Sequence, residues 1–219
     1  MVLHFDVILL MITFLISILA YRRYHDEKYL RTFPLFFLIV IIVEFTGTWL
    51  QARYGTNTFL YNLYSILEFS FFLFFYLQIF KRASVKRRIR YLLVIFPLLC
   101  LVNIFFVQGM HAFHTYSFTL GSIIINVLGV LYFFQLFNGK EKVNLLKHPA
   151  FWINVALIFF YTTSMSFLSV LNYVSTLPKS ITLQLVKLLV VVNSLKYTLF
   201  IIAFLCRINF RRSTYNTLG

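Results

Sequence analysis

Residues 33–51 read FPLFFLIVIIVEFTGTWLQ, a stretch in which Glu44 is the only charged side chain. A helix that crosses the hydrocarbon core of a bilayer needs about 20 mostly apolar residues. Pro34 falls in the first turn of such a helix, where the missing amide hydrogen costs little. The stretch therefore predicts a transmembrane helix that carries one carboxylate near its middle.

Similar stretches recur along the whole chain. Hydrophobic residues make up 61% of the 219 positions and charged residues only 12%, whereas a soluble domain has about a quarter charged residues. No soluble core of this size could bury so much apolar surface. We expect an all-α fold, a polytopic membrane helical bundle that forms a single transmembrane domain over residues 1–219. Its seven predicted transmembrane helices cover residues 2–21, 33–51, 58–80, 89–107, 113–137, 149–171 and 181–206.

The basic residues predict the orientation of this bundle. Sixteen lysines and arginines lie in alternate gaps and after the last span, and only Arg53 and Lys179 lie on the other side. Cytoplasmic loops carry the excess of positive charge in membrane proteins. The N-terminus is therefore predicted outside and the C-terminus in the cytoplasm, with the chain in the cell inner (plasma) membrane. Arg22 and Arg23 follow the first span, which is typical of an uncleaved helix rather than a signal peptide.

The net charge of +14 points to a membrane surface. The basic residues cluster between apolar runs, so they are expected to contact anionic lipid headgroups at the cytoplasmic face. No nucleic-acid-binding module accompanies them, and we expect no nucleic acid partner. Cys100 and Cys206 lie in separate spans and give no disulfide framework.

Ionisable side chains inside the predicted spans are the main candidates for function. Each costs at least about 2.5–3.5 kcal/mol near the bilayer centre and usually faces the bundle interior. Glu44 and Glu68 both lie about 15 Å into their helices. Thr48 shares a helix face with Glu44, and Tyr64 shares one with Glu68. These two stripes predict a polar groove that opens outward.

A lysine in the last span is the expected partner of the carboxylates. Lys196 lies too deep to reach water, and Asn193 is one turn away. Lys187 points to the opposite face of the same helix. The predicted site consists of Glu44, Thr48, Tyr64, Glu68, Asn126, Asn193 and Lys196. An ion-pair network that fixes packing, a ligand or ion site, and a conduction path all remain open interpretations.

Motifs for catalysis, cofactors and metals are weak. His4, Asp6, His111 and His114 fall near the predicted outer surface and are only weak candidates for zinc ligands, so no metal site and no cofactor is predicted. A lysine in the seventh span and an acid in the third also occur in retinal proteins, but no longer pattern of that class surrounds Lys196. No G-x-S-x-G segment and no phosphate-binding glycine loop occurs. No catalytic residue is assigned, and an enzyme is the less favoured interpretation.

Three segments together resemble a known family. They are Tyr61–Phe69 (YNLYSILEF), His148–Asn154 (HPAFWIN) and Asn193–Tyr197 (NSLKY). They are similar to segments of an uncharacterised family of small seven-span bacterial inner-membrane proteins, which tend to be encoded near sensor histidine kinases. The resemblance implies a sensory or accessory role and a membrane signalling partner such as a histidine kinase. It marks Glu68, Trp152 and Asn193 as positions to test.

The leading hypothesis is an integral membrane sensor or accessory subunit. Its polar pocket around Glu44 and Glu68 would bind a small ligand, an ion or a lipid headgroup, and its basic face would contact a membrane signalling partner. One alternative is a small channel or transporter that uses the same carboxylates. Another is an intramembrane lipid-modifying enzyme.

Overall fold

The computed structural model describes residues 5–21, 27–139, 144–168 and 178–215, with the side chains of 179 and 207–215 left out. All regular secondary structure in these ranges is helical, and they contain no strand. The α-helices are α1 (Phe5–Tyr21), α2 (Phe33–Tyr54), α3 (Thr58–Ile79), α4 (Ala83–Val102), α5 (Thr115–Phe137), α6 (Pro149–Leu168) and α7 (Lys179–Tyr215). The prediction of an all-α bundle is confirmed.

Six of the helices are long and apolar enough to cross a membrane. The chain is therefore a multi-pass membrane protein. Helix α1 is apolar but only 17 residues long in the described part of the chain. Residues 2–4 of the predicted first span and residues 169–171 of the predicted sixth span lie outside the described residues.

The helix boundaries differ most from the prediction where charged residues flank an apolar run. Helix α4 begins at Ala83, six residues before the predicted start, and takes in Lys86, Arg87 and Arg88. Lysine and arginine are good helix formers, so a helix does not need to end where its hydrophobic segment ends. For the same reason α7 continues past Cys206 to Tyr215.

Short helical segments connect some of the long helices. A 3₁₀ helix at Lys28–Thr32 leads directly into α2, and a second one at Leu145–Lys147 precedes α6. A π-helical turn at Asn103–Val107 follows α4. The turn between α2 and α3 begins at Gly55, which has a φ of 72°, a left-handed conformation that favours glycine at the end of a helix.

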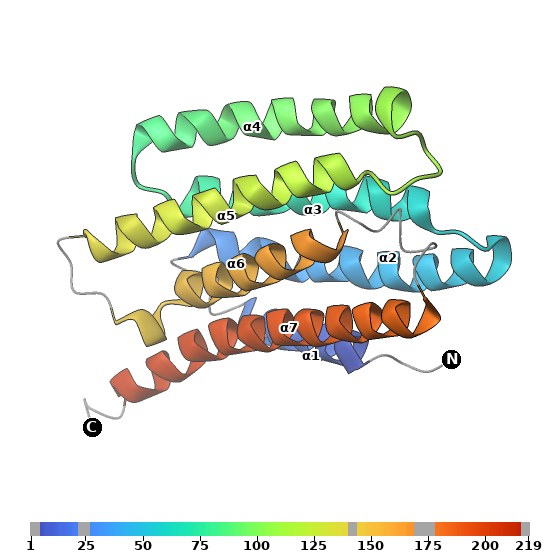
Figure 1. Ribbon diagram of the computed structural model, residues 1–219. Helices are drawn as coiled ribbons and strands as arrows, with labels where there is room; N and C mark the ends of the chain where they lie inside the picture. The colour runs from blue at the N-terminus through green and yellow to red at the C-terminus, as the bar shows by residue number, and fades with distance from the viewer. Residues whose placement is uncertain (1–4, 22–26, 140–143, 169–177, 216–219) are drawn as a thin grey trace.

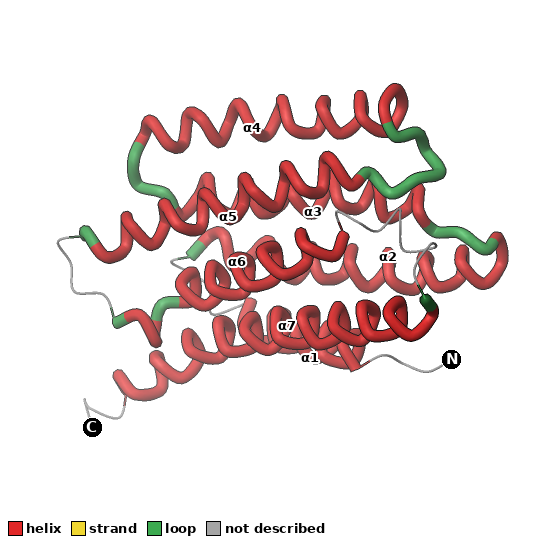
Figure 2. The backbone as a smooth tube through the Cα atoms, in the orientation of Figure 1, coloured by secondary structure: helices red, strands yellow, loops and turns green. Residues whose placement is uncertain are grey.

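The helices lie side by side with their axes roughly along one direction (Figures 1 and 2). Helix α7 packs against α1 and α6, and α3 packs against α2, α4 and α5. Helix α4 lies at the edge of the bundle, along the top of Figure 1. The α2–α3 turn and the α3–α4 connection lie at opposite ends of the bundle. We call these the Asn57 end and the Lys81 end.

Aromatic rings fill the middle of the bundle between α2, α3 and α7. The ring of Phe33 is fully buried, and its centroid lies 5.1–6.5 Å from six other rings. Most of these contacts are edge-to-face, which the aromatic quadrupole favours. The abundant phenylalanine thus serves helix packing. We define the aromatic cluster as Phe33, Phe36, Phe37, Phe71, Phe72, Phe75, Phe200 and Phe204.

Candidate functional site

A polar cavity of about 350 Å³ opens toward the Asn57 end of the bundle. Side chains from α1, α2, α3, α5, α6 and α7 line it, so residues far apart in the sequence meet there. Its polar lining consists of Asp6, Glu44, Asn57, Thr58, Tyr61, Tyr64, Ser65, Glu68, Ser164, Asn193, Lys196 and Tyr197. Four of these side chains are ionisable acids or amines: three carboxylates and one ammonium group.

The deepest charged groups in this cavity are Glu68 and Lys196. Their side chains are 7% and 6% exposed, and Lys196 Nζ lies 3.8 Å from Glu68 Oε1. The hydroxyl groups of Tyr64 and Tyr161 lie near the same carboxylate. Two opposite charges removed from water must be close together, because each alone would carry a large desolvation cost. The structure thus brings together the glutamate and lysine that the sequence predicts as partners.

Aromatic rings surround the ammonium group of Lys196. Its Nζ atom lies 3.8 Å from the centroid of the Phe160 ring and 4.9 Å from that of Tyr197. The faces of these rings carry partial negative charge and attract the cation. Lys187, nine residues earlier on α7, is exposed on the outside of the bundle. The positive charge of Lys196 is therefore compensated by the Glu68 carboxylate and by the two aromatic rings.

Glu44 lies nearer to the opening and is only half-buried. The Tyr61 hydroxyl donates a hydrogen bond of 3.2 Å to Glu44 Oε2, which links α2 to α3. Gly47 makes room for this tyrosine, because a Cβ atom there would lie 2.9 Å from the Tyr61 hydroxyl oxygen. Among the described residues no lysine or arginine pairs with Glu44.

Two further polar atoms of the cavity lining lack partners. Asp6 Oδ1 and Ser164 Oγ are buried and accept or donate no hydrogen bond within the described part of the chain. Buried polar atoms in proteins nearly always have a hydrogen-bond partner, which can be a water or a ligand. The cavity also carries three carboxylates against one ammonium group. Its unpaired groups and its charge both suit a small ligand that donates hydrogen bonds.

The structure does not bring every predicted site residue to this cavity. Asn193 and Tyr64 line it, as the helix spacing predicts. Thr48 is exposed, and its hydroxyl donates to the backbone carbonyl of Glu44 at 2.9 Å instead. Asn126 lies on α5, outside the cavity lining, with its Oδ1 atom buried and unpaired among the described residues. Helical spacing places a residue on a face but does not show which neighbour that face meets.

His114 is buried immediately before α5, although the sequence places it near the predicted outer surface. Its backbone amide donates to Asn62 Oδ1 at 3.1 Å, and the Asn62 amide donates to the Ala112 carbonyl at 2.9 Å. Burial lowers the pKa of His114 from 6.5 to about 4. The imidazole therefore stays neutral at physiological pH. Sequence reasoning missed this connection because Asn62 lies on α3, about 50 residues away.

The His114 ring also meets a serine of the cavity lining. Its Nε2 atom is hydrogen-bonded to Ser65 Oγ, and the Ser65 hydroxyl donates to the Asn62 carbonyl at 3.0 Å. A histidine beside a serine can activate it as a nucleophile when a third group orients the imidazole. Here His114 Nδ1 has no partner among the described residues, and the serine proton is already engaged. The pair thus holds α3 against the α4–α5 connection.

No three potential metal ligands gather anywhere in the described ranges. His111 is exposed, whereas His114 is buried and bonded to Ser65. Asp6 lines the polar cavity, and His4 lies outside the described residues. These side chains therefore do not form one zinc site in the described part of the chain.

Two other polar side chains hold helices together away from the cavity. Tyr76 donates a hydrogen bond of 2.7 Å to Asn154 Oδ1, and the Asn154 amide donates to the Gly129 carbonyl at 3.2 Å. This arrangement joins α3, α5 and α6. The Trp152 indole donates to the Leu146 carbonyl at 3.0 Å, at the other end of α6 from the cavity. Asn154 and Trp152 therefore have packing roles.

Comparison of the chain with family models, curated proteins and solved structures found no match.

Proposed function

We propose that this protein is an integral membrane sensor or accessory subunit that binds a small cation in the polar cavity around Glu44 and Glu68. The observation that carries the proposal is the charge imbalance of the cavity. Asp6, Glu44 and Glu68 face a single ammonium group, that of Lys196. Because Lys196 is paired with Glu68 and packed against two rings, the other two carboxylates remain available to a ligand.

The unpaired atoms narrow the chemical class of this ligand. Asp6 Oδ1 and the Glu44 carboxylate are hydrogen-bond acceptors, and the Ser164 hydroxyl can be either donor or acceptor. An ammonium, amine or hydrated metal cation offers several donors and a positive charge. A volume of about 350 Å³ is at the lower end of the range for small-molecule pockets. A small organic ammonium compound fits this combination of size and charge.

The proposed topology follows from the positive-inside rule. Seven spans with the N-terminus outside place the Asn57 end, and thus the cavity opening, at the outer face of the inner membrane. The basic residues at the Lys81 end then face the cytoplasm, where they would contact anionic headgroups and a signalling partner. The resemblance to proteins encoded near sensor histidine kinases supports a membrane-bound kinase as this partner.

Binding can be tested with the purified protein in lipid nanodiscs. Its melting temperature would be measured in sodium, potassium, ammonium and methylammonium chloride at constant ionic strength, with tetramethylammonium chloride, whose cation has no hydrogen-bond donor, as the reference. A ligand at 100 times its Kd stabilises by about 2.7 kcal/mol, which raises the melting temperature by roughly 5–10 °C for a chain of this length. We expect Glu44→Gln to abolish the shift and Thr48→Ala, one turn away outside the cavity, to keep it. A shift that survives Glu44→Gln contradicts the proposal, as does the absence of any shift.

A flux measurement separates the sensor from the alternatives. The sensor hypothesis predicts no cation or proton flux in proteoliposomes and a ligand-dependent change in the output of a copurified partner. Flux that disappears in Glu68→Gln would favour the channel or transporter. Lipid turnover by the purified protein would favour the enzyme.

A further inference from the structure

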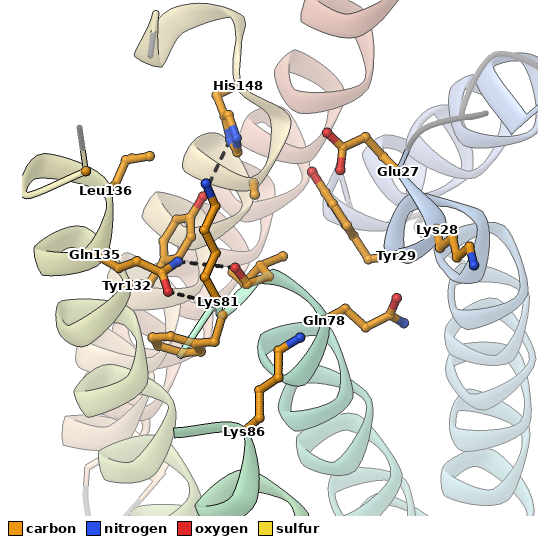
Figure 3. A pocket seen from close by; sticks show the side chains of 14 residues that line it. Glu27, Lys28, Tyr29, Gln78, Lys81, Lys86, Tyr132, Gln135, Leu136 and His148 are labelled. Carbon is orange, nitrogen blue, oxygen red and sulfur yellow. Dashed lines mark hydrogen bonds between the residues drawn. The ribbon is translucent and has the colours of Figure 1, made fainter. Parts of the chain in front are cut away.

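A second and larger cavity lies at the Lys81 end of the bundle. Its volume is about 920 Å³, and the ends of α3 and α5 and the starts of α4 and α6 form its walls together with the 3₁₀ helix before α2. Figure 3 shows Glu27 and Tyr29 on one side of the space and Tyr132, Gln135 and His148 on the other. This cavity shares no residue with the site around Glu44.

The charge of this second cavity is opposite to that of the first. Lys28, Lys81 and Lys86 line it together with His148, and Glu27 is the one acid among its lining residues. Figure 3 shows Lys86 rising into the space from α4 and Lys81 extending toward Tyr132 and His148. A cluster of ammonium groups around a space of this size suits an anionic group such as a phosphate.

Hydrogen bonds hold the segment that carries Lys81 in place. The Lys81 backbone amide donates to Gln135 Oε1 at 2.7 Å, and the Gln135 amide donates to the Ile79 carbonyl at 3.2 Å. One side chain of α5 thus fixes the chain as it leaves α3. On the same side, the hydroxyl of the buried Tyr132 lies 3.5 Å from His148 Nδ1. The wall of the cavity is therefore preorganised in the absence of a ligand.

The position of the cavity points to a lipid as the source of the phosphate. The cavity lies at the ends of membrane-spanning helices, at the depth where headgroups meet water. Leu136 lines it, and on the same helix Phe134 and Phe137 expose their rings. A headgroup in the cavity can thus leave its acyl chains against apolar side chains.

We propose that this cavity binds the headgroup of a phospholipid, with the phosphate between Lys81 and Lys86 and a hydrogen-bond donor of the headgroup at Glu27. The carboxylate of Glu27 accepts hydrogen bonds, so it suits the hydroxyls of phosphatidylglycerol or the ammonium of phosphatidylethanolamine. Phosphatidylcholine has neither donor. The inference does not depend on the ligand of the other cavity.

The test titrates each of these three lipids into the detergent-purified protein and counts bound lipids by native mass spectrometry. We expect phosphatidylglycerol and phosphatidylethanolamine to bind more tightly than phosphatidylcholine. The double variant Lys81→Ala/Lys86→Ala should weaken binding of both by about tenfold or more, which corresponds to about 1.4 kcal/mol. Arg87→Ala/Arg88→Ala removes the same charge from exposed positions of α4 outside the cavity and should change binding less than twofold.

Further arms separate the possible outcomes. Lys81→Arg/Lys86→Arg should retain binding, and the melting temperature of each variant shows whether it is folded. Equal losses of lipid affinity in the two alanine double variants would overturn the proposal. The lipid would then be attracted by the overall positive charge of this end of the bundle and not by the lysines of the cavity. If millimolar inorganic phosphate displaces the lipid, the proposal that the ligand is a lipid is overturned. The ligand of the cavity would then be a soluble phosphate compound. Unchanged binding of phosphatidylethanolamine by Glu27→Gln would overturn the role of Glu27.

Discussion

Glu68 and Lys196 stabilise the bundle as a pair, since either charge alone would remain in a water-poor interior. Breaking a buried ion pair by removing one partner typically costs about 3–5 kcal/mol. We therefore expect Lys196→Met to lower the melting temperature strongly. Glu68→Gln/Lys196→Met removes both charges and should recover most of the loss. Lys187→Met, at an exposed position of the same helix, is the matched control and should change the melting temperature little.

His114 gives a pH dependence whose sign can be worked out. Its pKa is about 4 in the folded protein and 6.5 when exposed, so between these values the unfolded chain binds more protons. Stability due to His114 is then fully present above pH 6.5 and is lost as the pH falls toward 4, by up to about 3 kcal/mol. Thermal unfolding between pH 4 and 7 measures this loss. His114→Gln should flatten the profile, and the exposed His111→Gln should leave it unchanged.

At the level of single residues, the sequence predicts charged groups in the middle of a span better than polar groups elsewhere. Glu44, Glu68 and Lys196 stand out because a charge in an apolar run needs a partner. Asp6 and Ser164 do not stand out, since an acid near a helix start and a serine in a span have ordinary explanations. Only the packing of α1 and α6 brings these two side chains to the same cavity.

Helix α5 can approach α3 closely because it carries a glycine at the contact. A Cβ atom at Gly121 would lie 2.7 Å from the ring of Phe69, which is itself 1% exposed and surrounded by other rings. We expect Gly121→Ala to destabilise the protein by about 1–3 kcal/mol, as overpacking of a core does. Thermal unfolding in detergent measures this effect. At Gly139 the nearest atom would be 3.4 Å away, so Gly139→Ala should have little effect, and equal losses would contradict this explanation.

Whole helices could be predicted from the sequence, and their ends could not. Hydrophobicity shows how much of a helix can lie in hydrocarbon, which is why the predicted and observed cores of α2, α3 and α5 agree closely. It does not show where backbone hydrogen bonding stops. Thus α4 extends through its basic residues before the apolar run, and α7 extends beyond Cys206.

For the molecule as a whole, the predicted orientation can be tested by cysteine labelling. In a background without Cys100 and Cys206, the exposed residue Thr56 in the α2–α3 turn and the exposed residue Ser84 at the start of α4 would be replaced singly. A membrane-impermeant maleimide should label Thr56→Cys in cells whose outer face is accessible and should label Ser84→Cys only after lysis. The reverse pattern would contradict the orientation. Labelling of both positions before lysis would contradict the prediction that α3, the one helix between them, crosses the membrane.

The arrangement of the two cavities could not be predicted, because it depends on which helices meet. Each predicted span is recognisable alone, but Asp6 and Glu44 line the same cavity only because α1 and α2 are neighbours. Likewise Glu27 and His148 face the same space only because α2 and α6 begin at the same end. A single sequence contains no direct record of these pairings.

Three residues of the aromatic cluster, Phe71, Phe72 and Phe75, lie between the two cavities along α3, and this has an electrical consequence. Along α3, Glu68 lines one cavity and Gln78 lines the other, a separation of about 15 Å. If water enters both cavities, the transmembrane voltage falls mainly across this ring-filled layer. A charge that crosses it gains or loses about 2.3 kcal/mol per 100 mV. A cation that reaches Glu44 from the Asn57 end would then sense little of the voltage, whereas a charge that crosses the ring-filled layer between the two cavities would sense nearly all of it.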